Sequence, residues 1–246
     1  MIKDKFLSSM IFAAGYGKRL KPLTDHTPKP LLPLNGICCL DRHLSALRDL
    51  NVENIVVNTY HLKDQIKSHI KGNKAITVLE EDEILETGGG VKNALPFLND
   101  VVLMLNGDIW LESYDIIIKM ISSYNESIMN GLLLIIPHSK ALFINSKGDY
   151  FINNATKDNT PGLITHKSFK NEKRAPFIFS GIQLWKKETL ENFKSEKKHF
   201  SMIDIFHETQ KNNKLYGMVF DKLWCDIGTI DAYEKLNHYL IEKEKK

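Results

Sequence analysis

The chain has 246 residues, and 33 lysines and arginines against 30 aspartates and glutamates give it a formal net charge of +3. A balance so near zero argues against the broadly basic surface of a nucleic-acid-binding protein, and 43% hydrophobic residues argue against disorder. No run approaches the roughly 18 apolar residues of a membrane span. We therefore expect neither a nucleic-acid partner nor a membrane partner.

The cysteines and the N-terminal segment indicate a cytoplasmic protein. The three cysteines are an odd number, and Cys38 and Cys39 are adjacent, which does not suit a disulfide framework. The apolar stretch 6–14 is interrupted by two serines and leads into a glycine-rich loop rather than a cleavage site. At roughly 100–200 residues per domain, the length favours one large domain or two small ones.

Short apolar runs alternate with helical patterns through the first half of the chain. We predict strands at 9–14, 54–59, 75–79, 101–105 and 132–136. Apolar residues at steps of three and four predict helices over 40–50 and 62–70. Such alternation is typical of the α/β class, with a Rossmann-like, mostly parallel sheet flanked by helices. Because these sheets bind ligands at the carboxyl ends of their strands, the segments directly after the strands are the first candidates for a site.

The second half is less regular at first. Residues 137–176 predict hairpins and loops, such as a lid or a substrate-binding insertion. Regular structure then returns, with a strand at 177–185, a helix near 202–206, a strand at 215–220 and a last helix at 233–240.

The segment after the first predicted strand is rich in glycine and cations. It reads GYGKRL over 15–20, and Lys29 comes later between two prolines. Glycines let backbone N–H groups approach phosphate oxygens, and prolines stiffen the loop that presents the lysine. The dinucleotide fingerprint would need a glycine at Leu20, and no P-loop pattern is present. The segment therefore favours a polyphosphate site, and the alternative is a surface turn with solvated cations.

Two aspartates come after predicted strands. Asp108 lies just beyond the strand at 101–105, and Asp226 precedes a Gly-Thr pair in which Thr229 is expected to cap the last helix. Proteins usually bind Mg²⁺ through one or two carboxylates together with substrate phosphates, so both aspartates are candidate ligands. The alternatives are that Asp108 caps a following helix and that Asp226 is an ordinary loop residue.

A third glycine-rich segment reads LETGGG over 85–90. Three consecutive glycines allow a flat ligand such as a nucleobase to approach the backbone closely. Glu86 would accept from N–H groups of the base, and Thr87 would offer its hydroxyl or backbone. The alternative is a flexible turn before a helix over 91–95.

Taken together, these segments resemble the sugar-1-phosphate nucleotidyltransferases, also called nucleotide-sugar pyrophosphorylases. The resemblance rests on the glycine loop with its Pro-Leu-Thr over 15–24 and on Pro-Lys-Pro-Leu over 28–31. LETGGG and the NGDIW sequence at 106–110 are similar to the short N-acetylmuramate-1-phosphate uridylyltransferase branch. The resemblance implies the nucleotide-diphospho-sugar transferase fold as one domain over 1–246. Its nucleotide-binding half would be 1–136 and its sugar-binding half 137–246.

The resemblance implies that a nucleotidyl group passes from a nucleoside triphosphate to a sugar 1-phosphate, with release of pyrophosphate. It assigns catalytic roles to Arg19 and Lys29, and a bound Mg²⁺ to Asp108 and Asp226. It implies nucleotide contacts from Ala14, Gly15, Gly17, Lys18, Glu81, Glu86, Thr87, Gly88 and Asn106. It implies that Gly148, Asp149, Ser180 and Gly181 border the sugar.

The resemblance leaves the substrates open. UTP with N-acetylmuramate 1-phosphate or a related amino-sugar phosphate is the first hypothesis, and GTP with mannose 1-phosphate is the second. The third is a non-catalytic regulatory subunit that binds a nucleotide-sugar. Many members carry a Glu-Lys pair for the sugar and its phosphate, for which the candidate lysines here are Lys157, Lys167, Lys170 and Lys173. We expect a monomer or small homo-oligomer, without the C-terminal β-helix of longer members.

Overall fold

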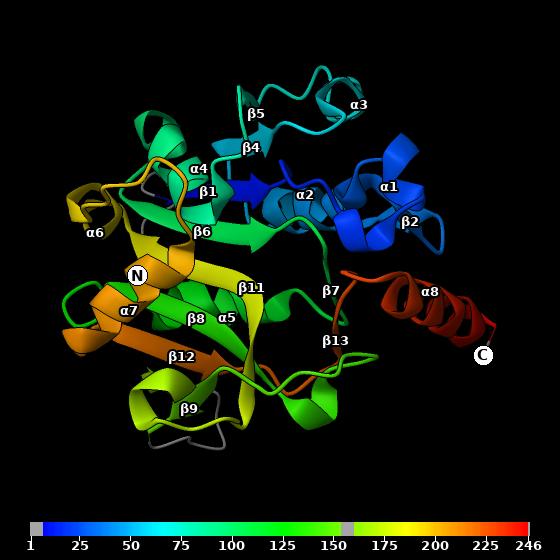
Figure 1. Cartoon of the computed structure of the whole chain (residues 1–246). Coiled ribbons are helices and arrows are strands. Elements are labelled where there is room, and N and C mark those ends of the chain that lie inside the picture. The colour runs from blue at the N-terminus through cyan, green and yellow to red at the C-terminus, as the bar shows by residue number, and fades with distance from the viewer. Residues whose placement is uncertain (1–6, 154–159, 246) are drawn as a thin grey trace.

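The computed structural model describes residues 7–153 and 160–245, which build a nine-stranded sheet with helices on both faces (Figure 1). The strand order is β5-β4-β1-β6-β11-β8-β12-β10-β9. The bounds are β1 (Leu7–Phe12), β4 (Ile55–Thr59), β5 (Ile76–Glu80), β6 (Val101–Asn106), β8 (Gly131–Pro137), β9 (Tyr150–Ile152), β10 (Gly162–His166), β11 (Phe177–Lys186) and β12 (Leu215–Val219). Two short ribbons pair β2 (Pro33–Leu34) with β3 (Ile37–Cys38) and β7 (Ile109–Leu111) with β13 (Trp224–Asp226).

The strand directions bring several loops to one edge of the sheet. β5, β4, β1 and β6 pair in parallel, as do β8 and β12. β11 is antiparallel to both β6 and β8, so these six strands point the same way. Their carboxyl ends therefore meet at the same edge, where such sheets bind ligands. The predicted mixed, mostly parallel sheet is confirmed.

Helices cover both faces of the sheet because neighbouring residues of a strand point in opposite directions. On β1, Ile11 packs in one cluster with Leu44, whereas Met10 packs in another with Phe206. The helices are α1 (Leu23–His26), α2 (Cys39–Asp49), α3 (Lys63–His69), α4 (Glu86–Ala94), α5 (Asp115–Ser123), α6 (Lys187–Asn192), α7 (Met202–Lys211) and α8 (Ile230–Glu244). Figure 1 shows α4, α6 and α7 together on one face. Within the described part of the chain, no helix combines the length and apolar character needed to span a bilayer.

The predicted elements lie close to the observed ones, and the structure adds short elements such as α1, α6, β2, β3, β7 and β13. Three further differences concern β1, α5 and α4. The first strand begins at Leu7 and ends at Phe12, two residues before each predicted limit. α5 was not predicted, because its run of β-branched isoleucines at 116–118 does not favour a helix over a strand. α4 begins at Glu86 instead of position 91, so the three glycines lie inside a helix.

The β7–β13 ribbon places the two candidate metal ligands side by side. Asp226 lies opposite Ile109, and the N–H of Ile227 donates to the carbonyl of Asp108 at 3.0 Å. The alternative that Asp108 caps a helix is wrong, because strand β7 comes next in the chain. Thr229 caps α8 as predicted: its hydroxyl accepts from the N–H of Ala232 at 3.3 Å.

The predicted hairpin of the irregular segment is confirmed. β9 and β10 pair in antiparallel fashion at the far edge of the sheet from β5. β9 also contacts the start of β11 through Tyr150 and Phe177. Lys157, one of the four candidate lysines, lies outside the described residues.

Candidate functional site

A cleft opens at the carboxyl ends of β1, β4 and β6, where a parallel sheet binds its ligands. Eight of its lining residues belong to the predicted site: Ala14, Gly15, Lys29, Glu81, Glu86, Thr87, Asn106 and Asp108. The structure therefore brings together residues that lie up to about 90 positions apart in the sequence.

Lys29 lies between two carboxylates. Its Nζ donates to Oδ2 of Asp108 and lies 3.6 Å from Oδ1 of Asp226. The lysine side chain is only 12% exposed, and burial by itself disfavours its charge. The negative charges of Asp108 and Asp226 outweigh burial and raise the pKa of Lys29. The result is an ammonium whose charge the two carboxylates favour, held by a stiff Pro-Lys-Pro loop.

The two aspartates respond to this environment in opposite ways. Burial opposes the ionisation of Asp108, but the charge of Lys29 outweighs it and lowers the pKa of Asp108. Burial and the charge of Asp108 raise the pKa of Asp226. Although Oδ1 of Asp226 is buried, it has no hydrogen-bond partner among the described residues. An unsatisfied carboxylate oxygen beside a second carboxylate fits a hard cation such as Mg²⁺.

Arg19 reaches the same place from the glycine loop. A Cβ added to Gly228 would lie 2.6 Å from Nη2 of Arg19 and 2.9 Å from Oδ1 of Asp226. Glycine at 228 therefore leaves the space that the guanidinium occupies beside the carboxylate. Both Arg19 and Lys18 are exposed residues, and Nζ of Lys18 lies 5.2 Å from the centre of the Tyr16 ring. Arg19 and Lys29 are thus the cations next to the two aspartates, whereas Lys18 lies against Tyr16.

Two glycines permit the close approach of the loops. Gly17 has a left-handed backbone, with φ of 62°, and its carbonyl accepts from the Thr24 hydroxyl at 2.9 Å. A Cβ on Gly107 would lie 2.5 Å from the Phe12 carbonyl oxygen and 3.0 Å from Cγ of Pro30. Any side chain at 107 would push the loop that carries Asp108 away from Lys29.

A polar network forms one wall of the cleft. The N–H of Ala13 donates to Asn58 at 3.0 Å, and Nδ2 of Asn58 donates to Oε1 of Glu81 at 2.7 Å. The second oxygen of Glu81 accepts from the N–H of Leu85 at 3.4 Å. Burial raises the pKa of Glu81. Because both of its carboxylate oxygens accept hydrogen bonds from protein groups, Glu81 stabilises the cleft wall. Glu86 is exposed at the cleft, with an unusual φ of 61°.

The first two glycines of α4 pack against protein, which gives them a reason other than the predicted flat ligand. The N–H groups of Gly88 and Gly89 donate to the Phe200 carbonyl at 2.8 and 3.2 Å. A Cβ on Gly88 would lie 2.4 Å from the Phe200 ring. Thr87 accepts from the N–H of Met202 at 3.0 Å, which fastens α4 to the start of α7. Gly88 is therefore buried against Phe200 and does not line the cleft.

The residues predicted to border the sugar lie just before β9 and on β11. Oδ2 of Asp149 accepts from the N–H of Phe179 at 3.0 Å. Nζ of Lys167 donates to the Gly148 carbonyl and lies 3.7 Å from Oδ1 of Asp149. Gly148 has φ of 70°, and a Cβ there would lie 1.9 Å from the Ala175 carbonyl oxygen. Among the candidate lysines within the described ranges, the structure pairs Lys167 with Asp149.

Strand β11 connects the residues around Asp149 to the cleft. Gly181 has φ of 87°, and a Cβ there would lie 2.9 Å from Nδ2 of Asn106, in the cleft. Ser180 is fully buried. Its hydroxyl accepts from the N–H of Ile182 at 3.0 Å, and its carbonyl accepts from the Trp224 indole at 2.9 Å. The side chain of Ser180 therefore holds the strand, and a direct sugar contact from it does not fit this position.

Sequence reasoning placed neither the cleft-wall residue Asn58 nor His43 in the site, and His43 is fully buried. Nε2 of His43 lies 3.0 Å from the Asn106 carbonyl, and Nδ1 lies 2.9 Å from the Tyr114 hydroxyl. Burial lowers the pKa of His43 to about 4, so the ring is neutral and has one donor and one acceptor. With Nε2–H donating to Asn106, Nδ1 accepts from Tyr114. His43 thus holds the turn that leads to Asp108.

A family model and several curated relatives match most of the chain. A family described as "Nucleotidyl transferase" matches residues 8–142 and 167–243. N-acetylmuramate alpha-1-phosphate uridylyltransferases from Caulobacter vibrioides and Neisseria meningitidis are 27% and 29% identical. Each alignment covers 91% of this chain, with 93% of the Caulobacter and 94% of the Neisseria protein. A bifunctional protein GlmU from Methanocaldococcus jannaschii is 27% identical over 96% of this chain and 55% of its own length.

Solved structures share the fold. A putative glucose-1-phosphate thymidylyltransferase from Bacillus anthracis has a TM-score of 0.75 at 18% identity, over 95% of this chain and 94% of that one. HddC from Yersinia pseudotuberculosis has a TM-score of 0.71 at 22% identity, over 95% and 99%. These likenesses show the fold, a mostly parallel α/β sheet with flanking helices. The chain belongs to the nucleotidyl transferase family, as its sequence motifs predicted.

We predict that His43 positions the Asp108 turn. His43→Leu leaves the Asn106 carbonyl and the Tyr114 hydroxyl unpaired, which should lower the unfolding free energy by about 1–3 kcal/mol. The displaced turn should also lower kcat by roughly tenfold, with little change in KM for the nucleotide. Tyr114→Phe keeps the contact to Asn106 and should have the smaller effect on kcat. Denaturation and steady-state kinetics measure both, and an unchanged kcat in His43→Leu would contradict the positioning role.

The two aspartates should differ in their effect on stability. Because the folded pKa of Asp226 is raised, its ionisation destabilises the metal-free fold above its unfolded pKa. Asp226→Asn should therefore raise the unfolding free energy, by less than about 1 kcal/mol because solvent screens this half-exposed side chain. This gain should shrink as pH falls towards about 4, where unfolded aspartate is protonated.

Asp108→Asn is the matched opposite. The folded pKa of Asp108 is lowered, so its contribution is present at neutral pH and lost in acid. Asp108→Asn should therefore lower the unfolding free energy by about 1–3 kcal/mol at neutral pH. Both variants should lose roughly 100-fold in turnover, because each removes a charge from the reacting site. Urea denaturation at several pH values tests the contrast, and equal destabilisation by the two variants would refute it.

Proposed function

We propose that this chain transfers the uridylyl group of UTP to N-acetylmuramate 1-phosphate or a related amino-sugar 1-phosphate, and releases pyrophosphate. The observation that carries the proposal is the placement of Lys29 between Asp108 and Asp226, beside Arg19. These charges suit a reaction between two polyanions. The names of the Caulobacter and Neisseria relatives support the choice of base and sugar.

In this reaction a phosphate oxygen of the sugar 1-phosphate attacks the α-phosphorus of the nucleotide. The bond from that phosphorus to the bridging oxygen breaks, and pyrophosphate leaves with the bond electrons. Phosphoryl transfer of this kind depends mainly on positioning and on charge neutralisation. Lys29 and Arg19 would supply positive charge beside the phosphates. Asp108 and Asp226 would hold Mg²⁺, which supplies further neutralisation when bound.

Lys167 is our proposed ligand for the phosphate of the sugar. It comes directly after β10, and its ammonium is already fixed by Asp149 and the carbonyl of Gly148. Asp149 in turn binds the backbone of β11 at Phe179, two residues before Gly181 contacts Asn106. One strand therefore connects the lysine to the cleft. This arrangement supports a sugar subsite that extends from the cleft along β11.

A substrate panel tests the reaction. Pyrophosphate release is measured for UTP, GTP, ATP, CTP and dTTP, each with N-acetylmuramate, N-acetylglucosamine, mannose and glucose 1-phosphates, with Mg²⁺ and with a chelator. We expect UTP with N-acetylmuramate 1-phosphate to give the highest kcat/KM, and the chelator to abolish turnover. Faster turnover of GTP with mannose 1-phosphate would replace our substrate assignment. Nucleotide-sugar binding without turnover of any pair would instead indicate a regulatory subunit.

The role of Lys167 has a matched control three residues away. Lys167→Met should raise KM for the sugar phosphate by about 10–100-fold, the usual value of a hydrogen bond between charged groups, and leave KM for the nucleotide unchanged. Lys170 is exposed and lies over the Phe151 ring, with its Nζ 4.5 Å from the ring centre, so Lys170→Met should leave both values unchanged. Equal effects of the two variants would exclude Lys167 from the sugar subsite.

A further inference from the structure

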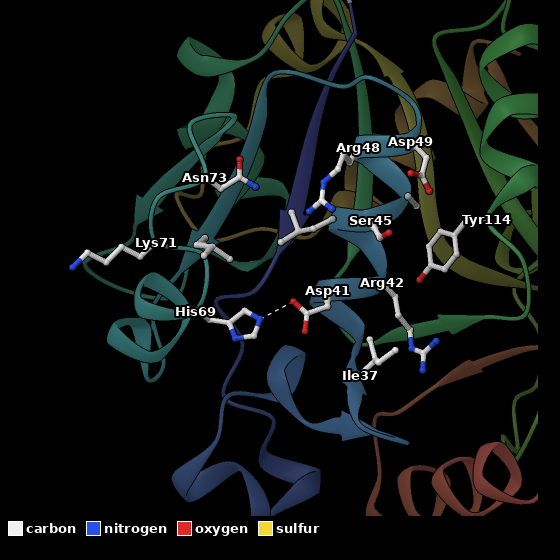
Figure 2. A pocket seen from close by; sticks show the side chains of 13 residues that line it. Ile37, Asp41, Arg42, Ser45, Arg48, Asp49, His69, Lys71, Asn73 and Tyr114 are labelled. Carbon is white, nitrogen blue, oxygen red and sulfur yellow. Dashed lines mark hydrogen bonds and ion pairs between the residues drawn. The ribbon is translucent and has the colours of Figure 1, made fainter. Parts of the chain in front are cut away.

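A second hollow lies outside the cleft, on the face of the sheet that α2 covers. It has a volume of about 620 Å³ and lies between α2 and the end of α3 (Figure 2). Its polar lining includes Asp41, Arg42 and Arg48 of α2, and His69 and Lys71 at the end of α3. The proposed reaction uses none of these residues. The hollow therefore needs an explanation of its own.

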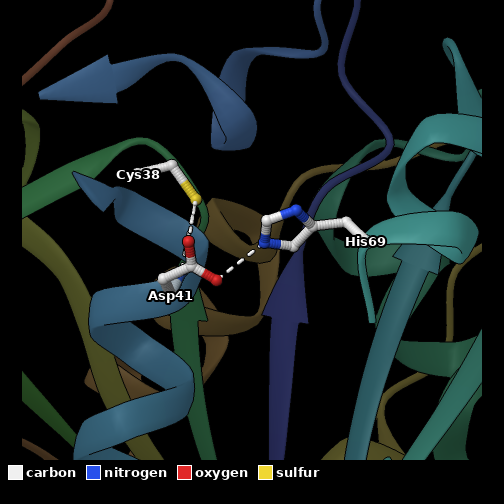
Figure 3. A group of neighbouring side chains, drawn as sticks. All are labelled: Cys38, Asp41 and His69. Atoms are coloured by element: carbon white, nitrogen blue, oxygen red, sulfur yellow. Dashed lines mark hydrogen bonds and ion pairs between the residues drawn. The ribbon is translucent and has the colours of Figure 1, made fainter. Parts of the chain in front are cut away.

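At one side of this hollow, three different metal-binding side chains converge (Figure 3). The Cys38 thiol donates to Oδ2 of Asp41 at 3.1 Å, and Nε2 of His69 lies 2.7 Å from Oδ1 of Asp41. Sγ, a carboxylate oxygen and the imidazole nitrogen all lie within 4.8 Å of one another. Within the described ranges, no other group of three or more histidine, cysteine, aspartate or glutamate side chains has its ligand atoms this close together.

We propose that Cys38, Asp41 and His69 form a binding site for a transition-metal ion, with Zn²⁺ as the ion that suits them best. Tetrahedral Zn²⁺ binds sulfur at about 2.3 Å and nitrogen or oxygen at about 2.0–2.2 Å, so its ligand atoms lie roughly 3.3–3.6 Å apart. The separations of 3.1 Å from Sγ to Oδ2 and 2.7 Å from Nε2 to Oδ1 are hydrogen-bond distances to two different oxygens of Asp41. With one oxygen taken from Asp41, the three ligand atoms lie within 4.8 Å of one another, so side-chain rotations would bring them to this spacing. Three protein ligands leave the fourth position to water or another ligand.

The charges of the site suit a divalent ion. As the sulfur–zinc bond forms, the Cys38 proton passes to solvent, and the thiolate and the Asp41 carboxylate together balance the two charges of Zn²⁺. Burial raises the pKa of the Cys38 thiol to about 12, although the N–H of Asp41 donates to its Sγ at 3.4 Å, so the sulfur gives up its proton only as the metal binds. Cys38 is only 5% exposed, whereas His69 and Asp41 are exposed by 36% and 43%. An ion can therefore enter from the hollow while the sulfur remains protected.

The ligand types separate this site from the aspartate pair of the cleft. Sulfur and imidazole prefer Zn²⁺ and related ions, whereas carboxylates with phosphates prefer Mg²⁺. The two sites therefore do not compete for the same ion. Because Cys38 and Asp41 are at the start of α2 and His69 ends α3, a bound ion would tie the two helices together. Metal binding should accordingly stabilise the fold.

Metal titration of the full chain tests the proposal without any activity assay. After treatment with chelator and reductant, Co²⁺ should give tetrahedral absorption bands and a thiolate-to-metal charge-transfer band. Cys38→Ser should abolish the charge-transfer band, whereas Cys225→Ser, which changes a buried cysteine outside the cluster, should keep it. Absence of the band in the wild type, or its persistence in Cys38→Ser, would overturn the proposal.

Zn²⁺ affinity supplies the second measurement, and it does not depend on the folding of the cysteine variant. His69→Gln and Asp41→Asn should each weaken Zn²⁺ binding by about tenfold or more in competition with a chelating dye. His238→Gln removes an exposed histidine elsewhere and should have no effect. Zn²⁺ should raise the melting temperature of the wild type and of His238→Gln but not that of His69→Gln. Equal affinities of the His69 and His238 variants would show adventitious surface binding and refute the site.

Discussion

The attraction between one lysine and two aspartates organises the reacting end of this molecule. A lysine that is largely removed from water loses hydration, and the carboxylates of Asp108 and Asp226 offset that loss. The three charges come from the Pro-Lys-Pro loop, the turn after β6 and the end of β13. The backbone can bring them together because Gly107 and Gly228 lack side chains where those loops meet.

This arrangement leaves one of its members poorly satisfied. Asp108 has the short contact to Lys29, whereas Oδ1 of Asp226 is buried without a hydrogen bond from any described residue, and the pKa of Asp226 is raised. Local instability of this kind is typical of sites built to receive a charged ligand. The rest of the fold tolerates it because His43 and the β7–β13 ribbon hold the surrounding backbone.

Local patterns were sufficient for most of the fold. Apolar runs and helical spacing located β4, β6, β11 and α2 to within about two residues, because burial on a sheet or a helix face imposes a period on the sequence. Local patterns failed at α5, because its three consecutive isoleucines suit a strand as well as a helix. They failed also at 88–90, where three glycines belong to a helix. Phe200 and the backbone of Lys198 pack against Gly88 and Gly89, and Glu81 and Asn58 lie against Gly90.

The sequence by itself determined the class of fold, the family and the charged residues of the cleft, because loops that carry glycine, proline and charge in a fixed order are local features. Only the tertiary structure decided which side chains face the cleft. It buried Ser180 and Gly88, gave Glu81 a supporting position, and brought His43 beneath the Asp108 turn. It also selected Lys167 among the candidate lysines and joined His69 to Cys38 and Asp41. These outcomes depend on contacts between distant segments, which neither composition nor periodicity records.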